Sequence, residues 1–235
     1  SLFKNFNEMI EKISGLMDKG YTEQQKKREY EHMALQSQIN AHFLYNTLER
    51  ICSLAYKNRN EDVVSMVKSL AMFYRSVLSK GRNIITIKEE LDNIKHYLEI
   101  QKIRYGKKFD YIINVDENIL DKHIVKLSLQ PLIENSIYHG IRQKAENGMI
   151  WVLGTKDEKN IMLSVVDDGI GFDGAECKKV LTGDGAISNS KSYGLKNVND
   201  RIKLYFGNEY GISISSTQGK GTRVELILPL IAFEA

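Results

Sequence analysis

The stretch "QPLIENSIYHGI", residues 130–141, places an acid, an amide and an imidazole (Glu134, Asn135 and His139) within about one and a half helical turns. At roughly 100° per residue, Asn135 and His139 fall on one face of a helix. Two interpretations fit this stretch. It is either an ordinary amphipathic helix with its polar groups in water, or a helix that presents a binding face.

Three further stretches follow it, and the first is "DDGIGF", residues 167–172. Here an expected strand ends in a carboxylate, Asp167, followed by the alternating glycines Gly169 and Gly171. Glycines let a backbone approach a ligand closely, and a carboxylate at a strand end can accept a hydrogen bond from an exocyclic amine. By itself the motif is weak, because strand–Asp–Gly turns are common.

The second stretch, residues 174–193, is rich in Gly, Ser, Asp and Lys and is predicted to be a long loop. Loops of this length in compact domains are usually lids or disordered segments. Gly194 is expected to open the next helix, whose N-terminal amides could meet a phosphate. The third stretch is the Gly-x-Gly-Thr turn at residues 219–222, for which an ordinary β-hairpin is the alternative interpretation.

The chain changes character near its middle. Residues 1–107 contain no proline and are dense in helix-forming residues. From Phe109 onward, short β-branched and aromatic runs predict strands, with helices expected at about 122–139 and 194–206.

The net charge of +3 is small and the charges are interspersed, so no nucleic-acid or membrane surface is implied. Cys52 and Cys177 lack metal-ligand spacing and are expected to be reduced thiols of a reducing compartment.

The N-terminal half is predicted to form a helical hairpin. Leu44 and Leu48 belong to a seam with nearly heptad spacing, and a second helix is expected at about 60–80, after the break at "KNRNED". A third helix, about 87–105, is expected to end at Gly106. Because a hairpin this thin buries little apolar surface, we expect it to pair with a second copy in a four-helix bundle, as a homodimer.

Taken in order, the four C-terminal stretches resemble the ATP-binding domain shared by histidine kinases, DNA gyrase, the chaperone Hsp90 and MutL mismatch-repair proteins. The segment "QINAHFLYNTLE", residues 38–49, is similar to the Asn-Pro-His-Phe-Leu-Tyr-Asn-Thr-Leu box of sensor histidine kinases of the LytS and YesM type. This resemblance implies an α+β chain in which a helical hairpin, forming a dimeric four-helix bundle, precedes an α/β sandwich ATPase domain of the Bergerat fold.

The resemblance also implies domain limits. Residues 1–20 would be the end of a HAMP-like signalling helix, and residues 21–82 the helical dimerisation and phosphotransfer domain. Residues 83–107 would be a connecting helix, and residues 108–235 the ATP-binding catalytic domain. Because the chain begins with Ser1, it is expected to be a piece of a longer protein. The HAMP-like resemblance implies a transmembrane segment and a sensor region upstream, which would place this part at the cytoplasmic face of a membrane.

The chemistry implied by the resemblance is autophosphorylation of His42 from Mg-ATP, followed by transfer of the phosphoryl group to an aspartate in the receiver domain of a response regulator. A neutral imidazole is an available nucleophile near neutral pH and needs exposure rather than strong activation. Asn46, one turn further on, could orient the imidazole or the water that later hydrolyses the phosphohistidine. In the usual histidine-kinase arrangement, an acid directly follows the histidine. Because that neighbour is Phe43 here, Glu134 is the candidate for the role.

The cofactors implied are ATP and Mg²⁺, with Asn135 as a Mg²⁺ ligand and Asp167 as the acceptor for the adenine amine. The remaining nucleotide contacts implied by the resemblance are His139, Gly169, Gly171, Gly194, Leu195, Asn197, Arg201, Gly219, Gly221 and Thr222. His139 and Arg201 are the candidates for contacts with phosphates or the lid.

Three positions depart from the family pattern. Ala41 stands where a proline is expected, which would bend the helix just before His42. Tyr138 occupies a position often filled by lysine, and Ser192 replaces a glycine at the end of the lid. Ala41 keeps open the alternative of a catalytically silent, ATP-binding dimeric signalling module. A gyrase-like or chaperone-like ATPase is a further alternative, but it gives no reason for the histidine box.

Overall fold

The computed structural model describes residues 41–78, 82–177 and 191–230. The HAMP-like helix expected at residues 1–20 lies outside the described residues, as does most of the expected lid, residues 178–190. The structure divides into two compact units, Ser1–Leu44 and Tyr45–Ala235. None of the helices in the described part of the chain combines the length and the hydrophobicity needed to cross a bilayer.

The N-terminal helices are α2 (Ala41–Tyr56) and α3 (Asn60–Leu78), so the predicted helical hairpin is confirmed at the level of its helices. Asn58 ends α2 with φ of 54°. The Asn58 amide donates to the Ala55 carbonyl at 3.0 Å, and the Arg59 amide donates to the Leu54 carbonyl at 3.0 Å. This is the Schellman pattern, in which asparagine tolerates the left-handed conformation that closes a helix.

Helix α4 (Ile87–Tyr105) follows, as the sequence predicts, and ends at Gly106. A capping box closes its first turn. The Thr86 hydroxyl accepts from the Glu89 amide at 3.2 Å, and the Glu89 carboxylate accepts from the Thr86 amide at 2.9 Å. The buried face of α4 includes Leu91, Ile94 and Leu98, and it packs against α3 on one side and against the α/β sheet on the other.

The five predicted strands are confirmed and form one sheet in the order β2-β4-β5-β7-β6. Strands β2 and β4 are parallel, and the other neighbours are antiparallel. Their bounds are β2 (Phe109–Val115), β4 (Gly148–Lys156), β5 (Asn160–Asp167), β6 (Gly211–Thr217) and β7 (Gly221–Pro229). Short 3-10 helices occur at η1 (Gly106–Lys108), η2 (Glu117–Ile119) and η4 (Gly174–Glu176).

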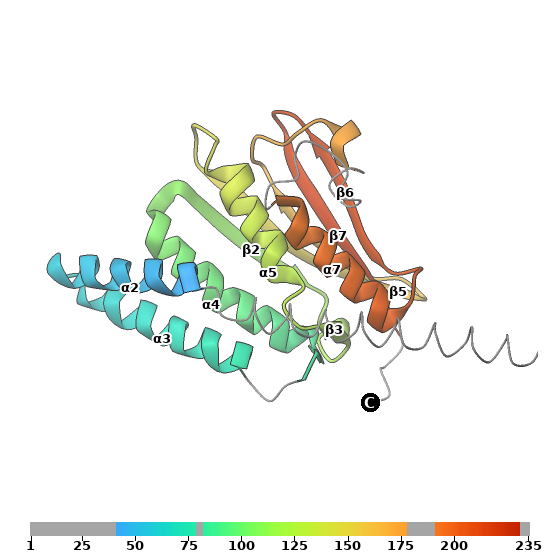
Figure 1. The fold of residues 1–235 in the computed structure, drawn as a ribbon, viewed down its shortest axis with the longest axis horizontal. Helices are drawn as coiled ribbons and strands as arrows, with labels where there is room; N and C mark the ends of the chain where they lie inside the picture. Colours follow the sequence, from blue (N-terminus) through green and yellow to red (C-terminus); the bar gives the residue numbers. More distant parts are fainter. Residues whose placement is uncertain (1–40, 79–81, 178–190, 231–235) are drawn as a thin grey trace, which may run out of the picture. The chain divides into compact units, whose positions relative to one another are not determined.

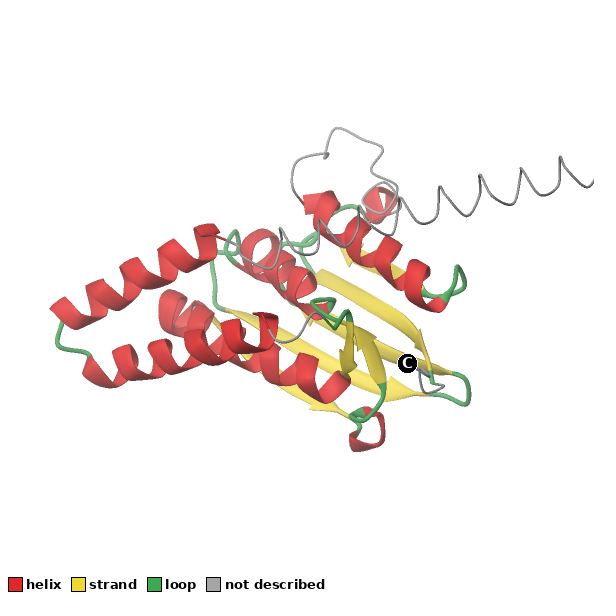
Figure 2. Ribbon diagram, turned by 60° about the horizontal axis from the view of Figure 1, so that its bottom comes forward, coloured by secondary structure: helices red, strands yellow, loops and turns green. Residues whose placement is uncertain are grey.

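Helices α4, α5 (Leu129–Asn135) and α7 (Lys191–Phe206) cover one face of this sheet, and Figures 1 and 2 show the resulting two layers. Burial alternates along β2, β4 and β6, as expected for strands with one face in the core and one in water. The fully buried side chains between the layers include Ile124, Leu132, Ile133, Val152, Leu163, Val165, Ile202 and Leu226. The predicted α/β sandwich is therefore confirmed.

The helix predicted at about 122–139 is wrong at its start. Residues His123–Val125 form strand β3, which pairs with β1 (Ile84–Thr86) in a separate two-stranded sheet. Leu127 then adopts φ of 59°, a left-handed conformation that no α-helix allows, and α5 begins only at Leu129. After Asn135 the chain continues as a π-helix, η3 (Ser136–Ile141), a form that often marks functional sites.

The expected start of the last helix at Gly194 is also wrong, because α7 begins at Lys191. Gly194 therefore lies within the first turns of the helix. A Cβ at this position would meet only the Cβ of Pro131, at 3.7 Å, so packing does not require a glycine there.

Candidate functional site

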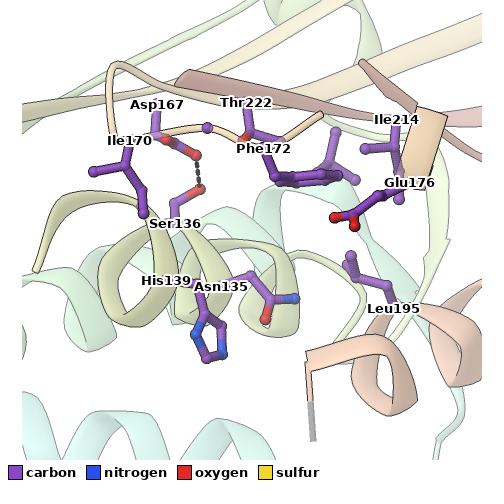
Figure 3. A pocket seen from close by; sticks show the side chains of 13 residues that line it. Asn135, Ser136, His139, Asp167, Ile170, Phe172, Glu176, Leu195, Ile214 and Thr222 are labelled. Atoms are coloured by element: carbon purple, nitrogen blue, oxygen red, sulfur yellow. Dashed lines mark hydrogen bonds between the residues drawn. The ribbon is translucent and has the colours of Figure 1, made fainter. Parts of the chain in front are cut away.

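A cavity of about 120 Å³ opens between the α5–η3 helix, the end of β5 and the hairpin of β6 and β7 (Figure 3). This volume is below the roughly 300 Å³ at which pockets enclose a drug-sized ligand, so the cavity suits one ring system with the rest of a ligand outside. Its lining residues are Asn135, Ser136, His139, Gly140, Asp167, Ile170, Gly171, Phe172, Glu176, Leu195, Ile214, Thr222 and Val224.

Asp167 is the buried polar group of this cavity, with 4% of its surface exposed. Its carboxylate accepts hydrogen bonds from the Ser136 hydroxyl at 2.9 Å and from the Gly169 amide at 3.0 Å. Burial raises the pKa of Asp167 to about 6, although these hydrogen bonds oppose the rise. A carboxylate with two oxygens retains acceptor capacity beyond these two bonds, so Asp167 can also accept from a ligand.

The glycine-rich segment after Asp167 packs closely against the β6–β7 hairpin. Gly171 has φ of 58°, and a Cβ there would overlap the carbonyl oxygen of Thr217. The Gly219 amide donates to the Ile170 carbonyl at 2.6 Å, and Thr222 pairs with Asp167 in the sheet register. The Gly-x-Gly-Thr turn is thus a β-hairpin, and its Thr222 lines the cavity, whereas a contact of this stretch with nucleotide stays a prediction.

Asn135 and His139 lie on the other side of the cavity. In Figure 3 their side chains extend from the same face of the helix, away from Asp167. Within the described residues, the side-chain amide of Asn135 makes no hydrogen bond, so its side-chain oxygen is available to a cation or a ligand. Five apolar side chains line the cavity: Ile170, Phe172, Leu195, Ile214 and Val224. The arrangement fits a flat apolar ring with an amine at Asp167 and a charged group near Asn135.

No group of three His, Cys, Asp or Glu side chains in the described ranges is placed to enclose a metal ion. Mg²⁺ commonly binds through one or two protein ligands together with substrate phosphates, and Asn135 is suited to such a site.

Several predicted site residues do not line the cavity. The Arg201 guanidinium donates to the carbonyl of Lys126 at 2.7 Å and is not part of the cavity lining, so its contact with phosphates or the lid stays a prediction. Gly194 and Asn197 lie on α7 outside the lining, whereas Leu195 of the same helix is part of it. Gly169, Gly219 and Gly221 contribute backbone around the cavity rather than lining it.

Glu134 also lies outside the lining and is directed toward α4. Its carboxylate accepts hydrogen bonds from the side-chain amide of Gln130, at 2.9 Å, and from the hydroxyl of the fully buried Tyr97. Burial raises the pKa of Glu134, and these two hydrogen bonds partly offset the rise. A carboxylic acid with a raised pKa is better suited to proton transfer near neutral pH than an exposed one.

The departure at Tyr138 is accompanied by two arginines. The Arg104 guanidinium lies 3.4 Å from the Tyr138 hydroxyl, and the Arg142 guanidinium lies 5.4 Å from the Tyr138 ring centroid. Tyr105 packs edge-on against the same ring, with centroids 6.5 Å apart. Positive charge is therefore present beside the position where the family often has a lysine, supplied by other elements of the chain.

The motifs did not predict several lining residues, including Ser136, Glu176, Phe172 and Ile214. Ser136 directly follows Asn135, and its pairing with Asp167 depends on the π-helical turn, which has no sequence signature here. Ile214 alternates with exposed residues along β6, so the period-two pattern could have placed it on the inner face but not at the cavity.

His42 lies on α2, one residue after the described chain begins, and its side chain is exposed. Asn46 follows four residues later on the same helix. The boundary between the two compact units falls after Leu44, so His42 belongs to the first unit and the cavity to the second.

Two family models match this chain. The model described as "Histidine kinase" matches residues 30–109. The model described as "Histidine kinase-, DNA gyrase B-, and HSP90-like ATPase" matches residues 122–232, which include every residue that lines the cavity.

Individual proteins are similar over most of the chain. The sensor histidine kinase YesM of Bacillus subtilis (strain 168) is 36% identical over 97% of this chain and 38% of its own length, so the chain spans well under half of that relative. The protein YwpD of the same organism is 33% identical over 96% of this chain and 79% of its own length. The histidine kinase domain of a blue-light activated kinase from Erythrobacter litoralis has a TM-score of 0.48 and 14% identity, over 86% of this chain and 96% of that one.

Proposed function

This chain belongs to the histidine kinase family, and we propose that it transfers the γ-phosphoryl group of Mg-ATP to His42 and then passes it to a response regulator. The observation that carries the proposal is the buried Asp167 carboxylate at one end of an apolar cavity whose other end is formed by Asn135 and His139. Such a site combines a slot for a nucleobase with an anchor for phosphates.

Adenine would enter the cavity with its exocyclic amine toward Asp167. The amine donates and the ionised carboxylate accepts, so Asp167 selects adenine over bases that present a carbonyl at this position. Ser136 and the Gly169 amide hold the carboxylate in place. Ile170, Phe172 and Ile214 supply apolar contact with the ring.

The phosphates would leave the cavity past Asn135. The side-chain oxygen of Asn135 would bind Mg²⁺, which neutralises charge on the β- and γ-phosphates when it is bound. His139, on the same face of the helix, would contact the phosphates. Arg104 and Arg142, which lie against Tyr138, would add to the positive potential on this side of the cavity.

In the transfer step, the lone pair of the unprotonated imidazole nitrogen of His42 forms a bond to the γ-phosphorus. The bond from that phosphorus to the oxygen bridging the β- and γ-phosphates breaks, and ADP leaves. The second ring nitrogen then loses its proton. Most of the catalysis would come from positioning and from charge neutralisation around the phosphoryl group. The exposure of His42 supports this role, because the imidazole must be reached by a second unit.

Glu134 is the proposed acceptor for that proton, and Asn46 the group that orients the imidazole. Glu134 accepts from Gln130 and Tyr97, so these bonds must open before it serves His42. A Glu134→Gln variant that phosphorylates itself at the wild-type rate would remove Glu134 from the mechanism. Asn46→Ala tests the second role, with an expected loss of phosphorylation rate and unchanged affinity for ATP.

A homodimer is also proposed, supported by apolar side chains left exposed on α2 and α3. The stripe on α2 consists of Tyr45, Leu48, Cys52 and Tyr56, which follow one another at spacings of three, four and four residues. All four side chains are exposed. On α3, Val64 and Val67 are 51% and 47% exposed, while Met66 and Phe73 fill its inner face. Two such stripes per chain would bury one another in a four-helix bundle of two copies.

The partner that receives the phosphoryl group would be the receiver domain of a response regulator. The relative named YesM is a sensor histidine kinase, and this chain spans 38% of its length. We infer that a transmembrane segment and a sensor region precede the part described here, which would then work at the cytoplasmic face of a membrane.

Incubation of the purified protein with γ-labelled ATP and Mg²⁺ tests the function. We expect a label on the protein that is labile in acid and stable in base, and that is lost in His42→Gln. Asp167→Asn should lose the label because it no longer binds ATP, whereas His42→Gln should bind ATP as the wild type does. A label that persists in His42→Gln would contradict the assignment of the phosphoacceptor.

A catalytically silent signalling module is the alternative, and the alanine before His42 favours it. A proline there would remove a backbone donor and bend the helix at the histidine, and Ala41 does neither. Binding of ATP without any phosphohistidine, in wild type and in Ala41→Pro alike, would support this alternative. A label that rises in Ala41→Pro would show that the site is competent and that presentation of His42 limits its rate.

A further inference from the structure

The Asn135-bearing helix α5 is capped by a residue from another helix. Ser128, at its N-cap position, makes no capping hydrogen bond, and its hydroxyl donates instead to the Val125 carbonyl at 2.6 Å. Glu90 of α4 caps the start of α5 in place of Ser128. The Glu90 carboxylate accepts from the Leu127 amide at 3.0 Å and from the Leu129 amide at 2.9 Å, and Glu90 has no exposed surface. A carboxylate at a helix N-terminus satisfies unpaired amides and complements the helix dipole.

Two further helices hold the same turn, residues 126–129. Lys126 is buried, and its ammonium group donates to the Val77 carbonyl at 2.6 Å, in the last turn of α3. Arg201 of α7 donates to the Lys126 carbonyl at 2.7 Å, and its positive charge acts favourably on Glu90. The turn is therefore bonded to α3, α4 and α7 before the chain enters α5.

The turn also contains the left-handed residue Leu127, with φ of 59°. A side chain other than glycine in this region costs roughly 1 kcal/mol or more and persists only where surrounding contacts fix it. One of the two amides that donate to Glu90 belongs to Leu127 itself, and the other belongs to Leu129, two residues later. The position and direction in which α5 starts thus depend on Glu90, and α5 carries Asn135 to the cavity at its C-terminal end.

We propose that Glu90 is a positioning residue for nucleotide binding, through which the connecting helix α4 sets Asn135 at the distance that Mg²⁺ requires. The inference rests on the proposed function, because it assumes that the cavity binds Mg-ATP. Asp167 belongs to β5, and its place in the sheet does not depend on the start of α5. Ser136 follows Asn135 directly and donates to Asp167, so loss of Glu90 also weakens recognition of the base. The Mg²⁺-dependent part of ATP binding loses more, because it depends on Asn135 itself, whereas Asp167 keeps its place in the sheet and its bond from the Gly169 amide.

The test compares Glu90→Gln with Asp92→Asn. Gln keeps the size of Glu90 but replaces one acceptor oxygen with an amide that faces a backbone donor. Asp92 lies on the same helix, and its carboxylate is 53% exposed and 3.6 Å from Lys95, so Asp92→Asn changes the same charge without touching α5. Calorimetry would measure the affinity of each protein for adenosine, for ATP with Mg²⁺, and for ATP with a chelator.

In the wild type and in Asp92→Asn, Mg²⁺ should strengthen ATP binding. In Glu90→Gln that gain should fall by roughly tenfold, the equivalent of about 1.4 kcal/mol, while the affinity for adenosine falls by a clearly smaller factor. Glu90→Asp, which keeps the charge on a shorter side chain, should be intermediate, and it serves the same comparison if Glu90→Gln does not fold.

The outcomes separate the two proposals. A wild type that binds neither adenosine nor ATP overturns the proposed function. A wild type that binds both, together with Glu90 variants that keep the full Mg²⁺ gain, overturns the positioning role. Equal losses for adenosine and Mg-ATP in those variants also overturn it, because they indicate a general loss of structure.

Discussion

Ser136 donates a 2.9 Å hydrogen bond to Oδ2 of Asp167 and so joins two segments that are 31 residues apart in the chain. One segment is the helix that carries Asn135 and His139, and the other is the strand that ends in the glycine-rich turn. The bond fixes the width of the cavity at its buried end. Burial raises the pKa of Asp167 to about 6. The hydrogen bond from Ser136 acts in the opposite direction, because it stabilises the ionised carboxylate.

The affinity for adenosine should depend on pH through Asp167. Only the ionised carboxylate accepts from the adenine amine without presenting a proton of its own, and its pKa in the free protein is about 6. Affinity should therefore rise as the pH is raised through 6 and be roughly tenfold weaker at pH 5 than at pH 7. Calorimetric titrations from pH 5 to pH 8 would measure this.

Two variants serve as controls for that profile. Asp167→Asn should bind weakly at every pH and show no step near pH 6. Ser136→Ala removes a hydrogen bond that lowers the pKa of Asp167, so its step should move to higher pH. A step that stays in place in Asp167→Asn would mean that another group controls binding.

Folding stability should change with pH in the opposite direction. The pKa of Asp167 is raised on folding from 3.8 to about 6, so the folded state binds the proton more tightly than the unfolded state does. The stabilisation is complete below pH 3.8 and is lost as the pH rises through 6, by at most about 3 kcal/mol. The free energy of unfolding of Asp167→Asn should lack this decline. Urea denaturation of both proteins at pH 4, 5, 6 and 7, analysed as the difference between them, isolates the contribution of Asp167 from those of other carboxylates.

The glycine at position 171 should be needed for space as well as for backbone conformation. Gly171 and Gly219 both have positive φ, 58° and 79°, but a Cβ on Gly171 would overlap the Thr217 carbonyl, whereas a Cβ on Gly219 meets nothing within 4 Å. Gly219→Ala should cost about 1 kcal/mol of stability from the backbone alone. Gly171→Ala should cost more and should also abolish adenosine binding, because the hairpin must move. Thermal denaturation and calorimetry check both variants, and equal effects would rule out the steric argument.

The exposed stripe of α2 and α3 should control dimerisation. Leu48 and Val67 are 45% and 47% exposed, so a charge at either position should leave the fold of one copy intact and weaken the association of two. Sedimentation equilibrium should give a dimer for the wild type and a much weaker one for Leu48→Glu and Val67→Glu. Ser65→Glu adds the same charge at an exposed position on the flank of α3 and should remain dimeric. A monomeric wild type would exclude the four-helix bundle.

The local conformation of most elements follows from the sequence alone. Short β-branched and aromatic runs predict the five strands, the apolar face of residues 87–105 predicts α4, and Gly106 predicts its end. These features depend on neighbours within a few residues, which is the range over which side-chain periodicity and capping act. The residues of the candidate site that motifs mark, such as Asn135, Asp167 and Thr222, are likewise brought together around one cavity.

Contacts between distant segments decided the rest. Strand β3 replaces the first turns of the predicted helix because β1 pairs with it, and Leu127 then takes a left-handed conformation that Glu90 and its neighbours stabilise. Arg201 turns to the Lys126 carbonyl, and Glu134 turns to Gln130 and Tyr97. A buried polar group must find its partner wherever the fold brings one, and that partner can be dozens of residues away. The sequence alone therefore determined most of the helices, the five strands of the main sheet and the residue types available for nucleotide chemistry. Only the tertiary structure decided where β1 and β3 pair and which of those side chains face the cavity.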